Sequence, residues 1–115
     1  MTLDLKPPQA LEMWRRALVE TVRREQPDLS ARQLALMLTV YLTPPPHTVR
    51  GLAAALNVSK PAITRALDRL GDLGLIKRKT DETDKRNVLV QRTVKGSVYL
   101  SEFADLIVLA AEETE

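Results

Sequence analysis

The chain has 115 residues, of which 44% are hydrophobic, 28% charged and only 3% aromatic. This length supports one domain with a modest core, and the scarcity of aromatic residues favours packed helices over a β-sandwich. The absence of cysteine excludes disulfides and thiolate metal sites, and a single histidine argues against a transition-metal centre. We therefore expect neither a metal nor a cofactor.

The formal net charge of +2 conceals an uneven distribution along the chain. Residues 31–95 carry twelve Lys or Arg against five acidic residues, whereas residues 96–115 carry five acidic residues and no basic one. A basic middle section beside an acidic end predicts a polyanionic partner for one face of the protein. The longest apolar run is too short to span a bilayer and no signal peptide is evident, so we expect a cytoplasmic protein without a membrane partner.

Two helices are predicted in the first third of the chain. Pro7–Gln26 is bounded by prolines, and its apolar residues recur at helical spacing. Ser30 and Gln33 match a capping box, which predicts a second helix through about Thr43 that is apolar on most sides. Pro44–Pro46 end it, because proline cannot continue a helix.

The next two predicted helices are short and are separated by a turn of about three residues. Thr48 is suited to cap a helix over Val49–Leu56, and Ser59 to cap a second one that continues to Leu73. Gly74 follows at the position where helices often end in a left-handed residue. Two short helices in this arrangement, the second with a polar outer face, are typical of a helix-turn-helix.

A charged β-hairpin is predicted directly after these helices. Leu75–Thr80 and Asn87–Arg92 are β-prone, and Asp81–Arg86 between them is polar or charged. The fold class that follows is mainly α with a small two-stranded β-wing, a winged helix-turn-helix. We expect one domain over residues 1–115, with the winged core at residues 30–93.

The last predicted helix runs from Val94 to about Glu112, capped by Thr93, and is apolar around much of its circumference. Because a core of this size cannot bury both terminal helices, residues 1–29 and 94–115 are expected to form a dimerisation layer. The alternative is that both helices pack on their own core. The predicted dimer interface consists of Leu11, Trp14, Leu18, Val98, Phe103, Leu106, Ile107 and Ala110.

Several short segments together resemble the MarR family of bacterial winged-helix regulators. They are Leu52-Ala53, Ser59, Ala66–Leu70, Gly74–Arg78, Asp84–Arg86, Val88–Val90 and Thr93–Gly96. The resemblance implies an obligate homodimer, a recognition helix in the DNA major groove and a wing arginine in the minor groove. By position Arg86 matches that arginine and Asp84 the residue that orients it. Asp68 and Arg78 match a pair joining the recognition helix to the wing, while Arg92 stands where the family usually has an apolar residue.

The resulting functional hypothesis is sequence-specific binding of double-stranded DNA by a homodimeric transcriptional regulator, most simply a repressor. Arg65 is the candidate for reading a base edge, because Arg pairs bidentately with guanine. The expected DNA-binding residues are Ser59, Lys60, Thr64, Arg65 and Arg69 on the helix and Lys77, Lys79, Lys85 and Arg86 on the wing. For each of these taken singly, the alternative is a solvated surface residue.

Competing functions remain open at this point. A winged helix can be a protein-interaction module that does not bind DNA. An enzyme is disfavoured, because we find no nucleophile–base pair, metal-ligand cluster or glycine-rich phosphate loop. RNA is disfavoured by the lack of an aromatic stacking platform. A small-molecule effector is a possible partner, with Trp14, Tyr41, Tyr99 and Phe103 either lining its pocket or belonging to the core.

Overall fold

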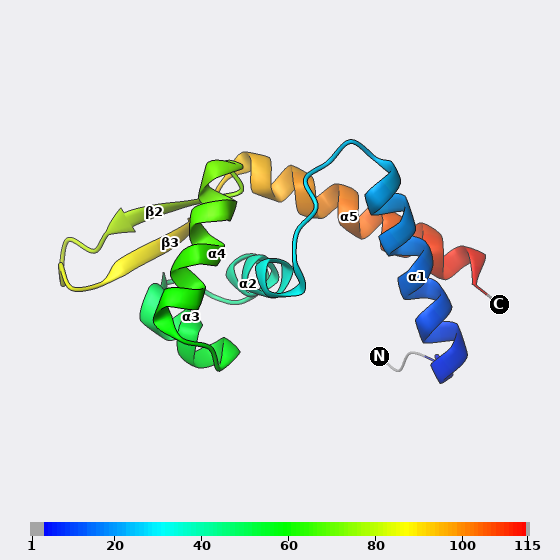
Figure 1. The fold of residues 1–115 in the computed structure, drawn as a ribbon, viewed down its shortest axis with the longest axis horizontal. Coiled ribbons are helices and arrows are strands. Elements are labelled where there is room, and N and C mark those ends of the chain that lie inside the picture. Colours follow the sequence, from blue (N-terminus) through cyan, green and yellow to red (C-terminus); the bar gives the residue numbers. More distant parts are fainter. Residues whose placement is uncertain (1–3, 115) are drawn as a thin grey trace. The chain divides into compact units, whose positions relative to one another are not determined.

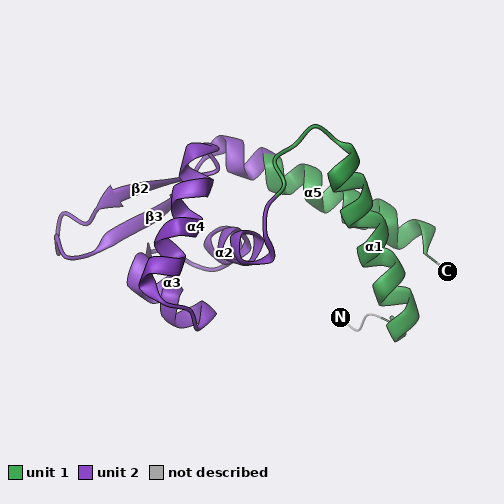
Figure 2. Cartoon of the chain, viewed as in Figure 1, with its two compact units in different colours: residues 1–28, 99–115 green, residues 29–98 purple. Residues whose placement is uncertain are grey.

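The computed structural model describes residues 4–114 as helices and one small antiparallel sheet (Figure 1). The elements are α1 (Pro7–Arg23), α2 (Ala31–Leu42), β1 (His47–Thr48), α3 (Val49–Leu56), α4 (Lys60–Asp72), β2 (Ile76–Thr80), β3 (Val88–Arg92) and α5 (Val94–Glu113). They form two compact units (Figure 2). The winged unit contains residues 29–98, and the terminal-helix unit contains the chain up to Asp28 and from Tyr99 onward.

Local capping signals explain where the helices of the winged unit begin. The Ser30 hydroxyl accepts a hydrogen bond from the Gln33 N–H at 3.1 Å, and the Gln33 side chain accepts one from the Ser30 N–H at 2.9 Å. Thr48 and Ser59 cap α3 and α4 in the same manner, through the third helical N–H. Each cap satisfies a donor that has no partner within its helix, so these three predicted starts are confirmed.

The end of α4 is set by Gly74, which has a φ of 75°. The Gly74 N–H donates to the Gly71 carbonyl and the Leu75 N–H to the Leu70 carbonyl, both at 2.9 Å. This pair of bonds is a Schellman motif, and it needs a left-handed residue that glycine adopts without strain. The chain leaves α4 at this point and enters the wing.

The sheet has three strands in the order β1-β3-β2, rather than the two predicted from sequence. β2 and β3 form the expected hairpin, with Ile76 opposite Arg92 and Thr80 opposite Val88. β1 pairs with the other edge of β3, placing His47 opposite Val90 and Thr48 opposite Leu89. Two residues carry too little periodicity to be recognised as a strand, and only the presence of β3 makes them one.

The core of the winged unit is aliphatic, as the composition predicts. Its most deeply buried residues are Leu36, Met37, Val40, Leu52, Ile63, Leu67, Leu70, Leu75, Ile76 and Val90. On β2 only Ile76 is buried and the four following residues are exposed. The hairpin therefore extends beyond the core of this unit (Figure 1). Its charged β2 side chains are exposed to solvent.

The start of α5 is fastened to the end of α4 by two hydroxyl groups. The Tyr41 hydroxyl donates to the Leu75 carbonyl at 2.6 Å and accepts from the Thr93 N–H at 2.9 Å. The Thr93 hydroxyl donates to the Gly74 carbonyl at 2.8 Å and accepts from the Gly96 N–H at 2.9 Å. A Cβ on Gly96 would overlap the Tyr41 hydroxyl and the Leu75 carbonyl, so only glycine permits this approach.

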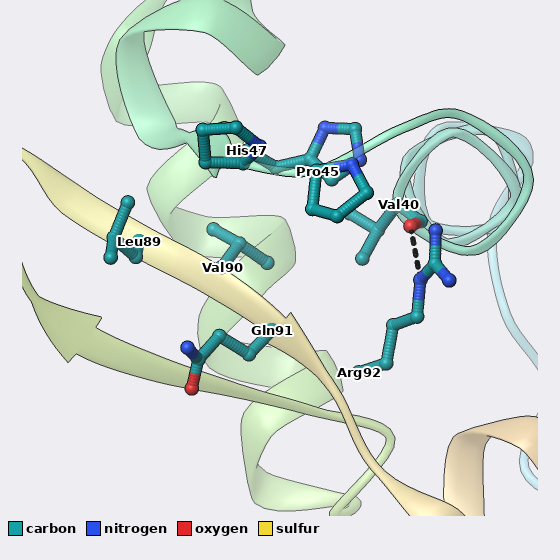
Figure 3. Close-up of a pocket in the computed structure, with 8 residues that line it drawn as sticks. Val40, Pro45, His47, Leu89, Val90, Gln91 and Arg92 are labelled. Carbon is teal, nitrogen blue, oxygen red and sulfur yellow. Dashed lines mark hydrogen bonds between the residues drawn. The ribbon is translucent and has the colours of Figure 1, made fainter.

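Arg92 closes the C-terminal end of α2, which has no basic residue in its own last turn. Its Nε donates to the Val40 carbonyl at 2.8 Å (Figure 3). A terminal nitrogen donates to the Thr43 carbonyl at 2.9 Å. Its guanidinium also lies 6.0 Å from the centre of the Tyr41 ring. A cation at this helix end satisfies carbonyls and complements the helix dipole, which explains how a charged residue is accommodated here.

The terminal-helix unit is formed by α1 and the part of α5 from Tyr99 onward. Trp14 and Phe103 meet edge to face with ring centres 6.4 Å apart, and Arg16 pairs with Glu113 at 3.1 Å. The Tyr99 hydroxyl donates to the Pro27 carbonyl at 3.3 Å. Helix α1 ends at Arg23, three residues before the predicted Gln26, because a residue preceding proline disfavours helical geometry.

The residues predicted for a dimer interface fall into two groups. Phe103, Leu106 and Ala110 are buried within the single chain. Leu11, Trp14 and Val98 are exposed, and Leu18 and Ile107 are partly buried. Val22, Val108 and Leu109, which the sequence hypothesis did not include, are also 47–69% exposed.

Candidate nucleic-acid interface

The exposed face of α4 carries the polar residues that the sequence assigned to DNA. Lys60, Thr64 and Asp68 are four residues apart and therefore lie in one row along the helix. Arg65 and Arg69 form a neighbouring row. The opposite side of α4 is buried, through Ile63, Leu67 and Leu70. Lys60, Arg65, Asp68 and Arg69 are exposed and Thr64 is partly so, whereas the Ser59 hydroxyl is used as the helix cap.

The loop at the tip of the wing is held by its own side chains. Asp81 accepts hydrogen bonds from the N–H and the hydroxyl of Thr83, at 2.9 and 2.7 Å. Backbone bonds from Asp81 to Asn87 and from Asn87 to Asp84 close the loop. The Thr83 hydroxyl and N–H lower the pKa of Asp81 below its usual range by stabilising the carboxylate. The loop thus has a defined shape without a core of its own.

Within this loop Asp84 fixes the direction of Arg86. Arg86 Nε donates to one carboxylate oxygen of Asp84 at 3.0 Å, and a terminal nitrogen donates to the other at 3.1 Å. The hydrogen bonds from Arg86 lower the pKa of Asp84, and those to Asp84 raise the pKa of Arg86. The Arg86 side chain is nevertheless 85% exposed, so its orientation is set while its remaining donors stay available.

A second ion pair joins the helix to the wing. Arg78 of β2 lies 2.8 Å from the Asp68 carboxylate of α4. Both side chains remain substantially exposed, so the pair contributes little to stability. Its consequence is geometric, because it ties the base of the hairpin to the middle of α4.

A basic hollow of about 120 Å³ lies where α3, α4 and the wing meet. Its lining consists of Val49, Arg50, Lys60, Thr64, Arg78, Arg86, Asn87 and Val88. The structure therefore brings together Lys60, Thr64, Arg78 and Arg86, four residues that the sequence had singled out. It does not place Arg65, Arg69, Lys77, Lys79 or Lys85 in this lining; they lie exposed along α4, β2 and the wing loop.

Arg50 is the residue of this hollow that the sequence analysis missed. It is the second residue of α3, two positions after the cap Thr48. The signal available in the sequence was its place in the first turn of the first helix of a helix-turn-helix, where backbone N–H groups already attract anions. That signal is weak on its own, because Arg86, the wing residue that completes the hollow, is 36 positions away in the sequence and nothing near Arg50 points to it.

A separate apolar cavity of about 260 Å³ lies beside β3 (Figure 3). It is lined by Val40, Pro45, Pro46, His47, Leu89, Val90, Gln91 and Arg92. None of the aromatic residues considered for an effector pocket is among them. Tyr41 uses its hydroxyl at the start of α5, Trp14 and Phe103 pack on each other, and burial raises the pKa of the Tyr99 hydroxyl.

Residues 4–114 show neither a metal-ion cluster nor a membrane-spanning helix. No group of three or more His, Cys, Asp or Glu side chains is arranged to hold a metal ion in this part of the chain. Within the same range, every helix is too short or too polar to cross a bilayer.

Comparison with solved structures identifies the same architecture in several proteins. A mutant of MepR from S. aureus matches with a TM-score of 0.70 and 21% identity, over 92% of this chain and 79% of that one. A mutant of MarR from E. coli, complexed with operator DNA, matches at 0.69 and 24%, over 92% and 70%. The transcriptional repressor CouR, bound to a 23-mer DNA duplex, matches at 0.71 and 23%, over 92% and 72%. At these identities the matches establish the fold.

The family assignment comes from the sequence rather than from the fold. Residues 29–88, more than half of the chain, match the sequence profile of the MarR family. This range holds α2, both helices of the helix-turn-helix, β2 and the wing loop, including all the residues that line the basic hollow. The protein is therefore a member of the MarR family.

Proposed function

We propose that this protein binds double-stranded DNA sequence-specifically as a homodimer and regulates transcription, acting as a repressor. The observation that carries the proposal is the basic hollow, because it requires α4 and the wing to present cations to the same side. A protein-interaction module would have no need for four cationic side chains from four separate elements in one place. The proposed role involves no catalytic step, and it would place the protein in the cytoplasm with the DNA.

The dimensions of α4 are compatible with readout of the major groove. Thirteen residues make a helix of about 20 Å, and one α-helix fits the width of the groove. In this arrangement Arg65 would face base edges, while Lys60 and Arg69 would contact phosphates. Arg86, oriented by Asp84, would enter the neighbouring minor groove. Structural relatives in complex with operator DNA and with a 23-mer duplex support the proposal that the partner is duplex DNA.

The proposed homodimer rests on apolar surface in the terminal-helix unit. Leu11 is 72% exposed and Val22 69% exposed on α1, while Val108 is 56% and Leu109 47% exposed on α5. Exposed large apolar side chains on two adjacent helices favour burial against a second copy, usually around a two-fold axis. A symmetric dimer would then engage two half-sites about one helical turn of DNA apart.

A binding measurement tests the proposal directly. Fluorescence anisotropy with the duplex upstream of the protein's own gene, and with random duplex of equal length, should give a clear preference for one sequence. The affinity should fall steeply over a salt series, since phosphate contacts release counterions. Light scattering of the free protein should give the mass of two chains. A monomer without any preference among duplexes would instead favour the protein-interaction module.

A further inference from the structure

The basic hollow contains more positive charge than its carboxylate neighbours balance. Arg78 is paired with Asp68, and Arg86 with Asp84. Arg50 and Lys60 belong to none of the ion pairs found between residues 4 and 114. The pKa of Asp84 is lowered mainly by its hydrogen bonds with Arg86, and the charge of Arg50 makes a smaller contribution in the same direction. Four cations against two carboxylates leave a net charge of +2 around the hollow.

The size of the hollow limits what it can hold. At about 120 Å³ it is well below the roughly 300–1,000 Å³ of pockets that enclose drug-sized ligands. A single small anionic group, such as one phosphate of a longer chain, fits this volume. The guanidinium groups offer paired N–H donors that match the two free oxygens of a phosphodiester.

The backbone of α3 adds to the same preference. Thr48 satisfies the N–H of Gly51, while Val49 and Arg50 stand in the first turn, where backbone N–H groups lack partners within the helix. Val49 itself lines the hollow. The positive end of the α3 dipole therefore reinforces the four cationic side chains.

From this arrangement we propose that the basic hollow seats one phosphate of the DNA backbone, with Arg50 and Lys60 as its ligands. The proposal rests on the proposed DNA binding and adds a specific role for α3. Arg50 anchors the first helix of the helix-turn-helix to the backbone while α4 lies in the groove. A phosphate held between α3, α4 and the wing fixes the register of the recognition helix on the duplex.

Variants that remove the charge of Arg50 test the phosphate site through their DNA affinity and its salt dependence. Arg50→Gln should weaken binding about 10-fold at moderate salt, as expected for loss of a hydrogen-bonded charge. The slope of log affinity against log salt should become shallower by about 0.9 per seat, or about 1.8 for a dimer on two half-sites. Arg50→Lys should keep the wild-type slope, because the charge remains. Arg32→Gln, which removes an exposed arginine of α2 outside the hollow, is the matched control and should change neither quantity.

Neutralising single phosphates on the DNA side identifies the seat. Each phosphate of one half-site is replaced in turn by an uncharged methylphosphonate, and affinity is measured for wild type and Arg50→Gln. One position should weaken the wild type clearly more than it weakens Arg50→Gln, in which Lys60 alone remains as a ligand of that phosphate. Provided that the wild type binds the duplex, either of two results overturns the phosphate seat alone. One is an unchanged salt slope for Arg50→Gln, and the other is the lack of any such position. If the wild type binds no duplex, the proposed function itself fails, and the seat with it.

Discussion

The basic side chains of the winged unit differ in how firmly their directions are set. Arg78 and Arg86 are each held by a carboxylate within 3.0 Å. Arg65 belongs to none of the ion pairs seen between residues 4 and 114 and extends from the exposed side of α4. Exposed ion pairs contribute little stability, so their main effect is orientation. An unpaired arginine beside oriented ones is well suited to read a base, because it loses no partner on binding.

Arg65→Ala should test that role. We expect the variant to lose about 1–3 kcal/mol of binding free energy on the preferred duplex and far less on random duplex. The comparison is made by anisotropy at one fixed salt concentration. If both duplexes lose affinity equally, Arg65 contacts a phosphate rather than a base.

Arg86→Ala should preferentially weaken sites flanked by A·T pairs, because a narrow minor groove attracts arginine most strongly. Asp84→Asn should cause a smaller loss of the same kind, since it leaves Arg86 present but less firmly oriented. Duplexes that differ only in flanking composition provide the measurement. Equal losses on G·C-rich flanks would contradict the minor-groove assignment.

The ion pair between Asp84 and Arg86 also leads to a prediction about the pH dependence of binding. Because Arg86 lowers the pKa of Asp84, the carboxylate is favoured in the folded protein, and its contribution is complete above the ordinary aspartate pKa. That contribution is lost only as the pH falls through the lowered value. Wild-type affinity on A·T-flanked DNA should therefore show no change from this pair between about pH 8 and pH 5.

At the level of helices and strands, the winged unit is joined by contacts between their ends. Arg92 of β3 closes the end of α2, and the Tyr41 and Thr93 hydroxyls fasten the start of α5 to the end of α4. These bonds satisfy carbonyl and N–H groups at element ends, which would otherwise require water. The wing is thereby attached at its base, although its outer half is exposed.

Two glycine substitutions should have opposite effects on these elements. Gly96→Ala should lower the free energy of unfolding by about 3 kcal/mol, because its Cβ would displace the Tyr41 hydroxyl from its partners. Gly71→Ala in α4 should raise it by about 0.5–1 kcal/mol, because the added Cβ meets no atom closer than 3.8 Å. Urea unfolding followed by circular dichroism measures both. A stabilising Gly96→Ala would contradict the close approach at α5.

At the level of the whole molecule, the proposed dimer depends on apolar residues that a single chain leaves exposed. Leu11→Glu together with Val22→Glu should shift the protein to monomers at micromolar concentration, weakening association by about 3 kcal/mol or more. Leu42→Glu is the matched control, since Leu42 is 75% exposed but lies in the winged unit. Light scattering reports the mass of each variant. A monomeric wild type, or a dimer that tolerates both substitutions, would contradict this interface.

Some predictions from sequence succeed because the forces behind them act within a few residues. Ser30, Thr48 and Ser59 each bond a backbone N–H three positions ahead, so a cap can be recognised without knowledge of the fold. Gly74 ends α4 for an equally local reason. The alternation of apolar and charged residues then predicts which side of α4 is buried. Together these features predict the winged helix-turn-helix, and the family match confirms it.

Other features were decided only when distant segments met. Strand β1 exists because β3 pairs with it. Arg92 donates a hydrogen bond to the Val40 carbonyl at the end of α2, which is 52 positions away in the sequence. The burial of Phe103, Leu106 and Ala110 in one chain removes them from the surface that a partner could cover. Arg50 joins Arg86 in one hollow because α3 and the wing fold against α4. The sequence by itself determined the helices, the hairpin and their charged faces, since those depend on neighbours along the chain. The composition of the basic hollow was decided by the tertiary structure, because it depends on neighbours in space.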